Sequence, residues 1–311
     1  MQGIELSERF FNEYGKKMLE DLGEIFPRVA AGIAGEGSEC LGYDDELSKD
    51  HDFDAGFCIW ITETDEEKFS FELMRAYSKL PKEFMGVKRQ ILSPVGGDRR
   101  GVITIESFYR KFLGSATAPR SAEHWLSLPS HSLLAASNGK VFMDNPGKFS
   151  EVRAIIKKGY PEDIKRKKLA ANLALMAQSG QYNYARLIAR GETGAAQLAA
   201  YEFTRRTVSS VYLINNAYEP FYKWAFRGLR DLPALSSLET PLLSVIESGN
   251  TKKESERKLE TIENICYIIA EELKKTGLSS ANGEGLEMHA FSVTDGIKDP
   301  NVRNLHILFG E

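Results

Sequence analysis

The sequence has few cysteines, no long hydrophobic run and no excess of basic charge. Its three cysteines, Cys40, Cys58 and Cys266, are far apart and include no Cys-x-x-Cys pair. This spacing argues against a disulfide framework or a zinc site and favours a reducing, cytoplasmic location. No apolar run approaches the roughly 18 residues that a membrane span needs, so no membrane partner is expected. The N-terminal residues mix acids and bases, and no signal peptide is expected.

The balance of acidic and basic residues argues against one class of function, the non-specific coating of nucleic acid. Forty Lys and Arg residues against 44 Asp and Glu residues leave a net charge of −4. Proteins that coat nucleic acid without sequence preference carry a basic excess, so that function is not expected. A local basic pocket for phosphates remains compatible with this balance. A length of 311 residues with 42% hydrophobic residues is typical of a globular protein with two domains.

Residues 1–150 mix helical and strand patterns. We expect a helix over 5–26 that ends at Pro27, a helix over 65–80 capped by Thr64 with Glu67, and strands over 28–34, 52–61, 101–106 and 140–144. From about residue 150 the strand patterns disappear. Helices are expected over 161–179, 183–190, 194–217, 220–230, 253–276 and 300–308. The sequence therefore predicts an α/β domain over 1–150 and a helical bundle over 151–311.

The most informative segment lies between the first two predicted strands. Gly37 and Ser38 are followed by eleven residues, and then Asp50-His51-Asp52 leads into an apolar strand. Because residues i and i+2 of a strand share a face, Asp50 and Asp52 are expected side by side. Two adjacent carboxylates are costly unless a cation neutralises them. Oxygen ligands of this kind suit Mg²⁺ or Mn²⁺.

The Gly-Ser pair supplies the second half of this pattern. Gly37 and Ser38 would open a short helix, where free backbone N–H groups attract a phosphate and a small residue lets it approach. A phosphate-binding turn before paired carboxylates is expected for nucleotidyl transfer with two metal ions. The plainer interpretation is an acidic surface loop, since Asp44, Asp45 and Glu46 lie nearby. The order of the elements favours the functional interpretation.

An apolar strand, Gly-Ser, nine to thirteen residues and an Asp-x-Asp entering a strand resemble the signature of the DNA polymerase β-like nucleotidyltransferase superfamily. More closely, the chain resembles a bacterial domain-of-unknown-function branch of it. The segments that carry this resemblance span roughly residues 30–235 and are GSECLGYDDELSKDHDF, WLSLPSHSLLAASNGKVFMD, YPEDIKRKKLA, SGQYNYARLIARGE and LINNAYEPFYKWAF. Asp54 departs from the branch, where glycine is expected, and adds a third acid to the face of Asp50 and Asp52.

The resemblance implies an α+β fold: a nucleotidyltransferase-like mixed sheet with flanking helices, followed by an all-α helical bundle. It also implies metal-dependent transfer of a nucleoside monophosphate from an NTP, with ATP expected, to an acceptor hydroxyl. The acceptor would be a small molecule, a tRNA or a protein. Gly37 and Ser38 would hold the β- and γ-phosphates, and Asp50 and Asp52 would ligate Mg²⁺ or Mn²⁺.

The superfamily usually has a third acid on a neighbouring strand, as metal ligand or general base. Glu106 is the best candidate, because alternation along GVITIE places it on the polar face of the strand. Its alternative role is a helix N-terminal glutamate that the helix dipole stabilises. Asp144 competes, although the Asn-Pro-Gly that follows it is typical of a turn with an acidic first residue.

The second half of the chain offers cations for the nucleotide or the acceptor. Arg186 and Arg190 are four residues apart on one helical face, and Lys223 lies in an aromatic-rich segment. Arg190 and Lys223 are the nucleotide-binding candidates. Glu192 or Glu202 could instead neutralise the arginines, and Lys223 could extend into solvent. The alternative function is a catalytically silent nucleotide-binding or partner-binding protein on the same fold.

Overall fold

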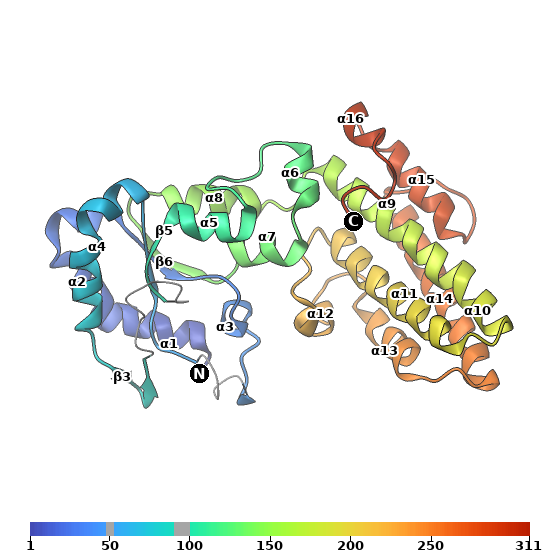
Figure 1. Cartoon of the computed structure of the whole chain (residues 1–311), viewed down its shortest axis with the longest axis horizontal. Helices are drawn as coiled ribbons and strands as arrows, with labels where there is room; N and C mark the ends of the chain where they lie inside the picture. The colour runs from blue at the N-terminus through green and yellow to red at the C-terminus, as the bar shows by residue number, and fades with distance from the viewer. Residues whose placement is uncertain (48–52, 90–99) are drawn as a thin grey trace. The chain divides into compact units, whose positions relative to one another are not determined.

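The computed structural model describes residues 1–47, 53–89 and 100–311, and the fold is α+β (Figure 1). The chain divides into two compact units. The first comprises Met1–Pro119 and Pro129–Lys158, and the second comprises Arg120–Leu128 and Gly159–Glu311. A mixed sheet with flanking helices forms the first unit, and the described part of the second unit is helical. None of the helices in the described ranges is both long and apolar enough to cross a membrane.

The sheet of the first unit has the strand order β5-β2-β1-β6. Its strands are β1 (Ala30–Ile33), β2 (Cys58–Ile61), β5 (Gly101–Thr104) and β6 (Lys140–Asp144). β1 is antiparallel to β2 and β6, whereas β2 is parallel to β5. Ala30 lies opposite Trp60, and Gly32 lies opposite Cys58. This register brings the chain that leaves β1 next to the chain that enters β2.

Helices surround this sheet. They are α1 (Gly3–Phe10), the π-helix η1 (Phe11–Gly15), α2 (Lys16–Glu20), the 3₁₀-helix η2 (Gly23–Arg28), α3 (Ser38–Leu41), α4 (Glu63–Ser78), α5 (Ile105–Leu113), α7 (Ser130–Ser137) and α8 (Lys148–Ile156). A hairpin of β3 (Glu83–Phe84) and β4 (Val87–Lys88) follows α4. The single helix expected over 5–26 is thus divided into four helical segments, and Pro27 lies inside the last of them.

Two helix starts differ from the sequence prediction. The cap of α4 is Thr62, whose hydroxyl oxygen accepts a hydrogen bond from the Asp65 N–H, rather than Thr64. β5 ends at Thr104, whose side chain caps α5 by accepting from the Ser107 N–H. The strand expected over 101–106 is therefore two residues shorter, because a side-chain cap at Thr104 starts the helix there.

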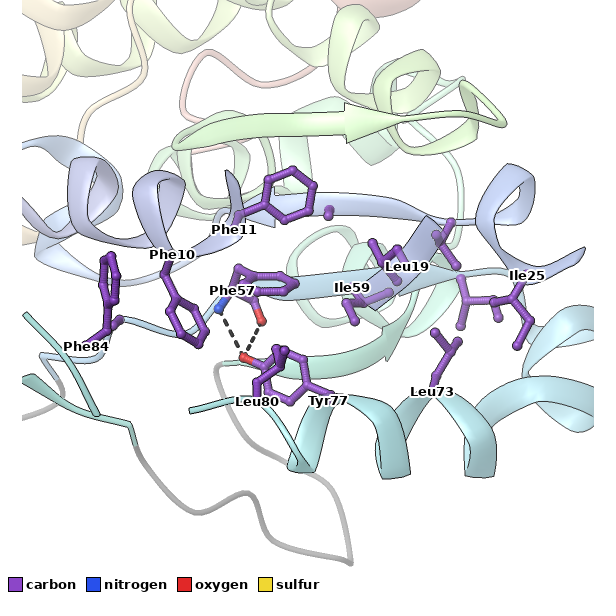
Figure 2. Packing of buried hydrophobic residues seen from close by; sticks show 14 of the residues in the cluster. Phe10, Phe11, Leu19, Ile25, Phe57, Ile59, Leu73, Tyr77, Leu80 and Phe84 are labelled. Carbon is purple, nitrogen blue, oxygen red and sulfur yellow. Dashed lines mark hydrogen bonds between the residues drawn. The ribbon is translucent and has the colours of Figure 1, made fainter. Parts of the chain in front are cut away.

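A hydrophobic cluster of aliphatic and aromatic side chains forms the core on one face of the sheet, and Figure 2 shows it from close by. Its aromatic cluster is Phe10, Phe11, Phe57, Tyr77 and Phe84. Phe57, directly before β2, is fully buried and contacts the rings of Phe10, Phe11 and Tyr77. The Tyr77 hydroxyl donates to the Phe57 carbonyl at 2.8 Å and accepts from the Phe57 N–H at 3.0 Å. The segment that enters β2 is thus held by its backbone as well as by its side chain.

Helix α8 belongs to the first unit, which includes Pro129–Lys158. The Arg153 guanidinium donates to the carbonyls of Ser137, Asn138 and Gly139 at 3.0, 2.7 and 2.7 Å. Phe149 stacks on Trp60 of β2, with ring centroids 3.8 Å apart. These contacts bury the helix against the strand and the turn that precedes β6.

The second unit consists of helices that range from short single turns to the long helices α11 and α14. They are α6 (Ala122–Ser127), α9 (Glu162–Met176), the π-helix η4 (Ala177–Tyr184), α10 (Ala185–Ala189), α11 (Thr193–Ile214), α12 (Tyr222–Leu229), the 3₁₀-helix η5 (Ser236–Leu238), α13 (Glu239–Glu247), α14 (Lys252–Lys275), α15 (Leu286–Asp295) and α16 (Pro300–Arg303). The expected break after residue 179 is absent, since η4 joins α9 to α10. Gly180 packs against the Phe203 ring, where a Cβ would clash. The glycine thus serves helix packing rather than a turn.

Two lysines of α9, the buried Lys167 and the half-buried Lys168, bind carbonyl groups of the C-terminal residues. Lys167 donates to the carbonyl of Leu305 at 2.6 Å. Lys168 donates to the carbonyls of Leu126 and Gly310, both at 2.9 Å. Burial lowers the pKa of Lys168 to about 8. The charged form of this side chain is therefore less favourable in the folded protein than in water.

The low pKa of Lys168 predicts how stability changes with pH. The folded pKa of about 8 lies below the ordinary value of 10.5, so the unfolded chain binds more protons between these values. The contribution of this side chain to stability should therefore be lowest below pH 8 and rise as the pH increases from 8. We expect the Lys168→Met variant to lose this rise, which amounts to roughly 1–2 kcal/mol between pH 7 and 9.5. Urea unfolding at several pH values measures it.

Lys275→Met is the matched control, because the Lys275 side chain is 75% exposed. This variant should follow the pH profile of the unaltered protein. A Lys168→Met variant that keeps the full rise in stability would show that other groups cause it.

Candidate functional site

The predicted phosphate-binding residues lie where the chain turns after β1, whereas Asp50 and Asp52 lie outside the described residues. Gly37 is the N-cap of α3, with extended backbone, and Ser38 is the first residue of that helix. A Cβ at position 37 would meet the Glu39 carboxylate, so a larger residue there would force this flexible side chain to move. Packing against Glu39 is thus a second reason for glycine at position 37, besides the predicted close approach of a phosphate.

The turn before Gly37 is held by the loop that precedes β6. Gly35 has a φ of +119°, which favours glycine. The Gly35 N–H donates to Asn138 Oδ1 at 2.9 Å, and Asn138 Nδ2 donates to the Gly35 carbonyl at 2.7 Å. The Gly139 N–H donates to the Cys40 carbonyl at 3.0 Å. Since Arg153 binds the carbonyls of Asn138 and Gly139, α8 fixes the turn through this loop.

A cavity of about 370 Å³ opens beside this turn. It is lined by residues 34–37, by Cys58 of β2, by Arg100 with 102–104 of β5, by Glu66 of α4, and by one face of α5. Lys111 of α5 lies at this cavity and pairs with Glu36 at 2.7 Å, with both side chains more than half exposed. The cavity therefore combines backbone of the glycine-rich turn with two cationic side chains.

Arg100 is the buried cation of this cavity. Its Nη2 lies 2.6 Å from Glu39 Oε1, and the two side chains are 6% and 11% exposed. Burial alone would lower the pKa of Arg100, but the surrounding groups, with the paired Glu39 carboxylate among them, raise it overall. Arg100 therefore remains a cation. Burial also raises the pKa of the Cys40 thiol to about 12, so this cysteine stays protonated and does not act as a nucleophile.

The carboxylates of both candidates for a third acid, Glu106 and Asp144, accept hydrogen bonds from backbone N–H groups. Glu106 lies in the first turn of α5, and its Oε2 accepts from the Glu63 N–H at the start of α4, at 3.0 Å. Its position on a strand face was a wrong expectation, since β5 ends two residues earlier. Asp144 accepts from the N–H groups of Gly147 and Ser150 at 2.9 and 2.7 Å, as expected of a turn residue. The catalytic role of Glu106 stays a prediction.

Asp54, the additional acid of the motif, stabilises a turn. Its side chain is buried, and its Oδ1 accepts from the Gly56 N–H at 2.6 Å. Within residues 1–47, 53–89 and 100–311, no group of three His, Cys, Asp or Glu residues is placed to hold a metal ion. The predicted ligands Asp50 and Asp52 fall outside these ranges. Their carboxylate oxygens are the donors that Mg²⁺ and Mn²⁺ prefer, so the donor chemistry fits.

Arg190 and Lys223 both lie in the second unit. Arg190 is exposed at the end of α10. Lys223 is exposed on α12, with its Nζ 5.5 Å from the centre of the Trp224 ring. Glu202, a possible partner of the arginine pair, instead binds Arg205 and Arg206. The nucleotide-binding roles of Arg190 and Lys223 stay predictions.

Sequence reasoning missed Arg100 and Glu39. Arg100 lies outside the elements that the sequence predicted, and Glu39 was not singled out among the acids that follow the Gly-Ser pair. The pair is 61 residues apart in the chain, and no local pattern connects two such residues. Only their positions in the sequence could have pointed to these two residues: Arg100 directly precedes an apolar strand, and Glu39 follows the Gly-Ser pair.

Comparison with known protein families gives a match for one part of the chain. Residues 125–225 match the family described as a domain of unknown function (DUF4037). This match lies within the stretch, roughly 30–235, on which the resemblance to a domain-of-unknown-function branch was based. None of the curated proteins that were compared matches the chain.

One similar solved structure is the crystal structure of a nucleotidyltransferase-like protein from Exiguobacterium sibiricum. It has 10% sequence identity and a TM-score of 0.35, over 86% of this chain and 79% of that chain. A TM-score of this size supports no assignment of site or function.

Proposed function

We propose that the chain is a metal-dependent nucleotidyltransferase. It would move a nucleoside monophosphate from an NTP, with ATP the expected co-substrate, to the hydroxyl of a small molecule, a tRNA or a protein. The observation that carries this proposal is the cavity beside the turn of Gly35–Gly37, between the end of β1 and the start of β2. In the chain, the Gly-Ser pair closes this turn and the Asp-x-Asp sequence follows eleven residues later, as in the superfamily signature that the sequence resembles.

Each residue of the motif has a role in the proposed reaction. Gly37 and Ser38 would bind the β- and γ-phosphates, and Asp50 with Asp52 would hold Mg²⁺ or Mn²⁺. When bound, the metal ions stabilise the developing charge on the attacking and leaving oxygens. The acceptor oxygen attacks the α-phosphorus in line, the bond from this phosphorus to the β-phosphate oxygen breaks, and pyrophosphate leaves. The acceptor proton passes to a base, for which Glu106 is the candidate.

A catalytically silent nucleotide-binding or partner-binding protein is the second candidate. The observation that favours it is the engagement of both possible third acids. Glu106 would have to release the Glu63 N–H to act as a base or metal ligand, and Asp144 would have to release the N–H groups of Gly147 and Ser150 at the start of α8. Releasing a part-buried N–H in this way has an energetic cost.

Titration calorimetry with ATP, in the presence and absence of Mg²⁺, tests the nucleotide site. Metal-dependent binding is expected, because the metal ion offsets the repulsion between the triphosphate and the carboxylates. If ATP does not bind in a metal-dependent way, the chain is neither a transferase of this kind nor a catalytically silent nucleotide-binding protein. Incubation with an α-labelled NTP and a cell extract then separates the two, since only a transferase moves label to an acceptor.

A further inference from the structure

One residue that lines the cavity, Arg100, belongs to a buried ion pair that the proposed mechanism does not use. Arg100 lines the cavity, and its guanidinium is paired with Glu39 at 2.6 Å. Both side chains are almost completely buried. Taking two charges out of water is expensive, and a hydrophobic pair of the same size is often at least as stable. A stabilising role alone therefore gives a weak reason for this pair at the edge of a cavity.

The position of the Glu39 carboxylate is informative. It lies directly against Gly37, where an added Cβ would clash with the carboxyl carbon and both oxygens. A carboxylate therefore occupies the space next to the glycine that is predicted to bind phosphate. A carboxylate is planar and a phosphate is tetrahedral, but both are oxyanions. The guanidinium group of arginine binds either one with charge-assisted hydrogen bonds. The two anions would compete for one cation and one space.

We propose that Arg100 binds the phosphate groups of the nucleotide, and that Glu39 holds this cation in the nucleotide-free protein and is displaced when the nucleotide binds. This inference rests on the proposed function and adds a phosphate-binding residue and an internal competitor to it. Glu39 is tethered beside Gly37 and neutralises Arg100 until a phosphate replaces it, so the cation never stays buried without a counter-charge.

A second ion pair at the same cavity supplies the matched control. Glu36 and Lys111 also line the cavity, but their side chains are 60% and 56% exposed. Water and salt screen such exposed charges, and pairs of this kind contribute little. Substitutions in this pair change the net charge of the cavity by the same amount as substitutions in the buried pair, without removing a buried contact.

The experiment measures binding of α,β-methylene ATP with Mg²⁺ by calorimetry. Glu39→Gln should bind the analogue about tenfold more tightly than the unaltered protein, because the internal competitor has lost its charge. Arg100→Gln should bind it at least about tenfold more weakly. Glu36→Gln and Lys111→Gln should stay within about threefold of the unaltered protein. Without nucleotide, Glu39→Gln should melt at a lower temperature, and the analogue should raise its melting temperature by more than in the unaltered protein.

The double variant Glu39→Gln/Arg100→Gln covers the case in which a single substitution prevents folding, since it removes both charges of the pair together and leaves neither without its partner. It should bind the analogue as weakly as Arg100→Gln. If the unaltered protein does not bind ATP with Mg²⁺, the proposed function fails and this inference fails with it. If it does bind, and Glu39→Gln is no tighter than Glu36→Gln or the double variant is as tight as the unaltered protein, the inference is wrong while the proposed function stands.

Discussion

Asp52→Asn is expected to lower the rate of nucleotidyl transfer about a thousandfold or more. The substitution removes one anionic oxygen from the pair that is predicted to hold the metal ions. A thousandfold loss corresponds to ~4 kcal/mol of transition-state stabilisation, the size of effect that metal ions supply in such reactions. Transfer from an α-labelled NTP to an acceptor in cell extract measures it. Asp50→Asn should have the same effect, since the two carboxylates act together.

Folding should survive these substitutions. Because each removes repulsion between neighbouring carboxylates, the melting temperature should stay the same or rise slightly. Asp45→Asn is the matched control: it makes the same chemical change in the same acidic stretch, at an exposed position. It should retain transfer. Equal transfer by Asp52→Asn and the unaltered protein would contradict the metal-ligand role, and a large fall in melting temperature would indicate a structural role instead.

Phe57→Ala is expected to destabilise the first unit by about 3–5 kcal/mol. The Phe57 ring is fully buried and touches three other rings, so its removal leaves a cavity in the centre of the cluster in Figure 2. The backbone bonds from Tyr77 to residue 57 limit how far the chain can move to fill this space. Urea unfolding followed by circular dichroism measures the loss.

Phe71→Ala is the control for this change. Phe71 lies on α4 and is 74% exposed, so its removal should change the free energy of unfolding by no more than about 0.5 kcal/mol. If both substitutions have the same small effect, the aromatic cluster does not hold the sheet to α4, and the segment before β2 must be held by its hydrogen bonds alone.

Much of the fold could be predicted from local patterns. Strands β1, β2, β5 and β6 lie within the four ranges that alternation and β-branched residues predicted. The sequence also indicated that strands give way to helices from about residue 150 onward. The exact starts of elements were less predictable, because Thr62 and Thr64 are equally good caps by type. Which of them caps α4 depends on where the sheet releases the chain.

Helix continuity was harder to predict. Ser179-Gly180-Gln181 is typical of a break, yet the chain continues through it as a π-helix. The reason is a long-range contact: Gly180 fits against Phe203 of α11, which no window around residue 180 contains. Similarly, α8 belongs to the first unit because Arg153 reaches the carbonyls before β6, a contact that composition does not report.

By itself, the sequence determined the order of chemical groups around the proposed site: a strand, a glycine and a serine, and two aspartates before a second strand. That order is a property of the chain and does not depend on packing. Only the tertiary structure decided which charges meet. It brought Arg100 to Glu39, tied Glu106 to the start of α4, and held Gly35 with Asn138. These pairs join residues 43 to 103 positions apart, and they form because buried charges and backbone groups need partners wherever the fold supplies them.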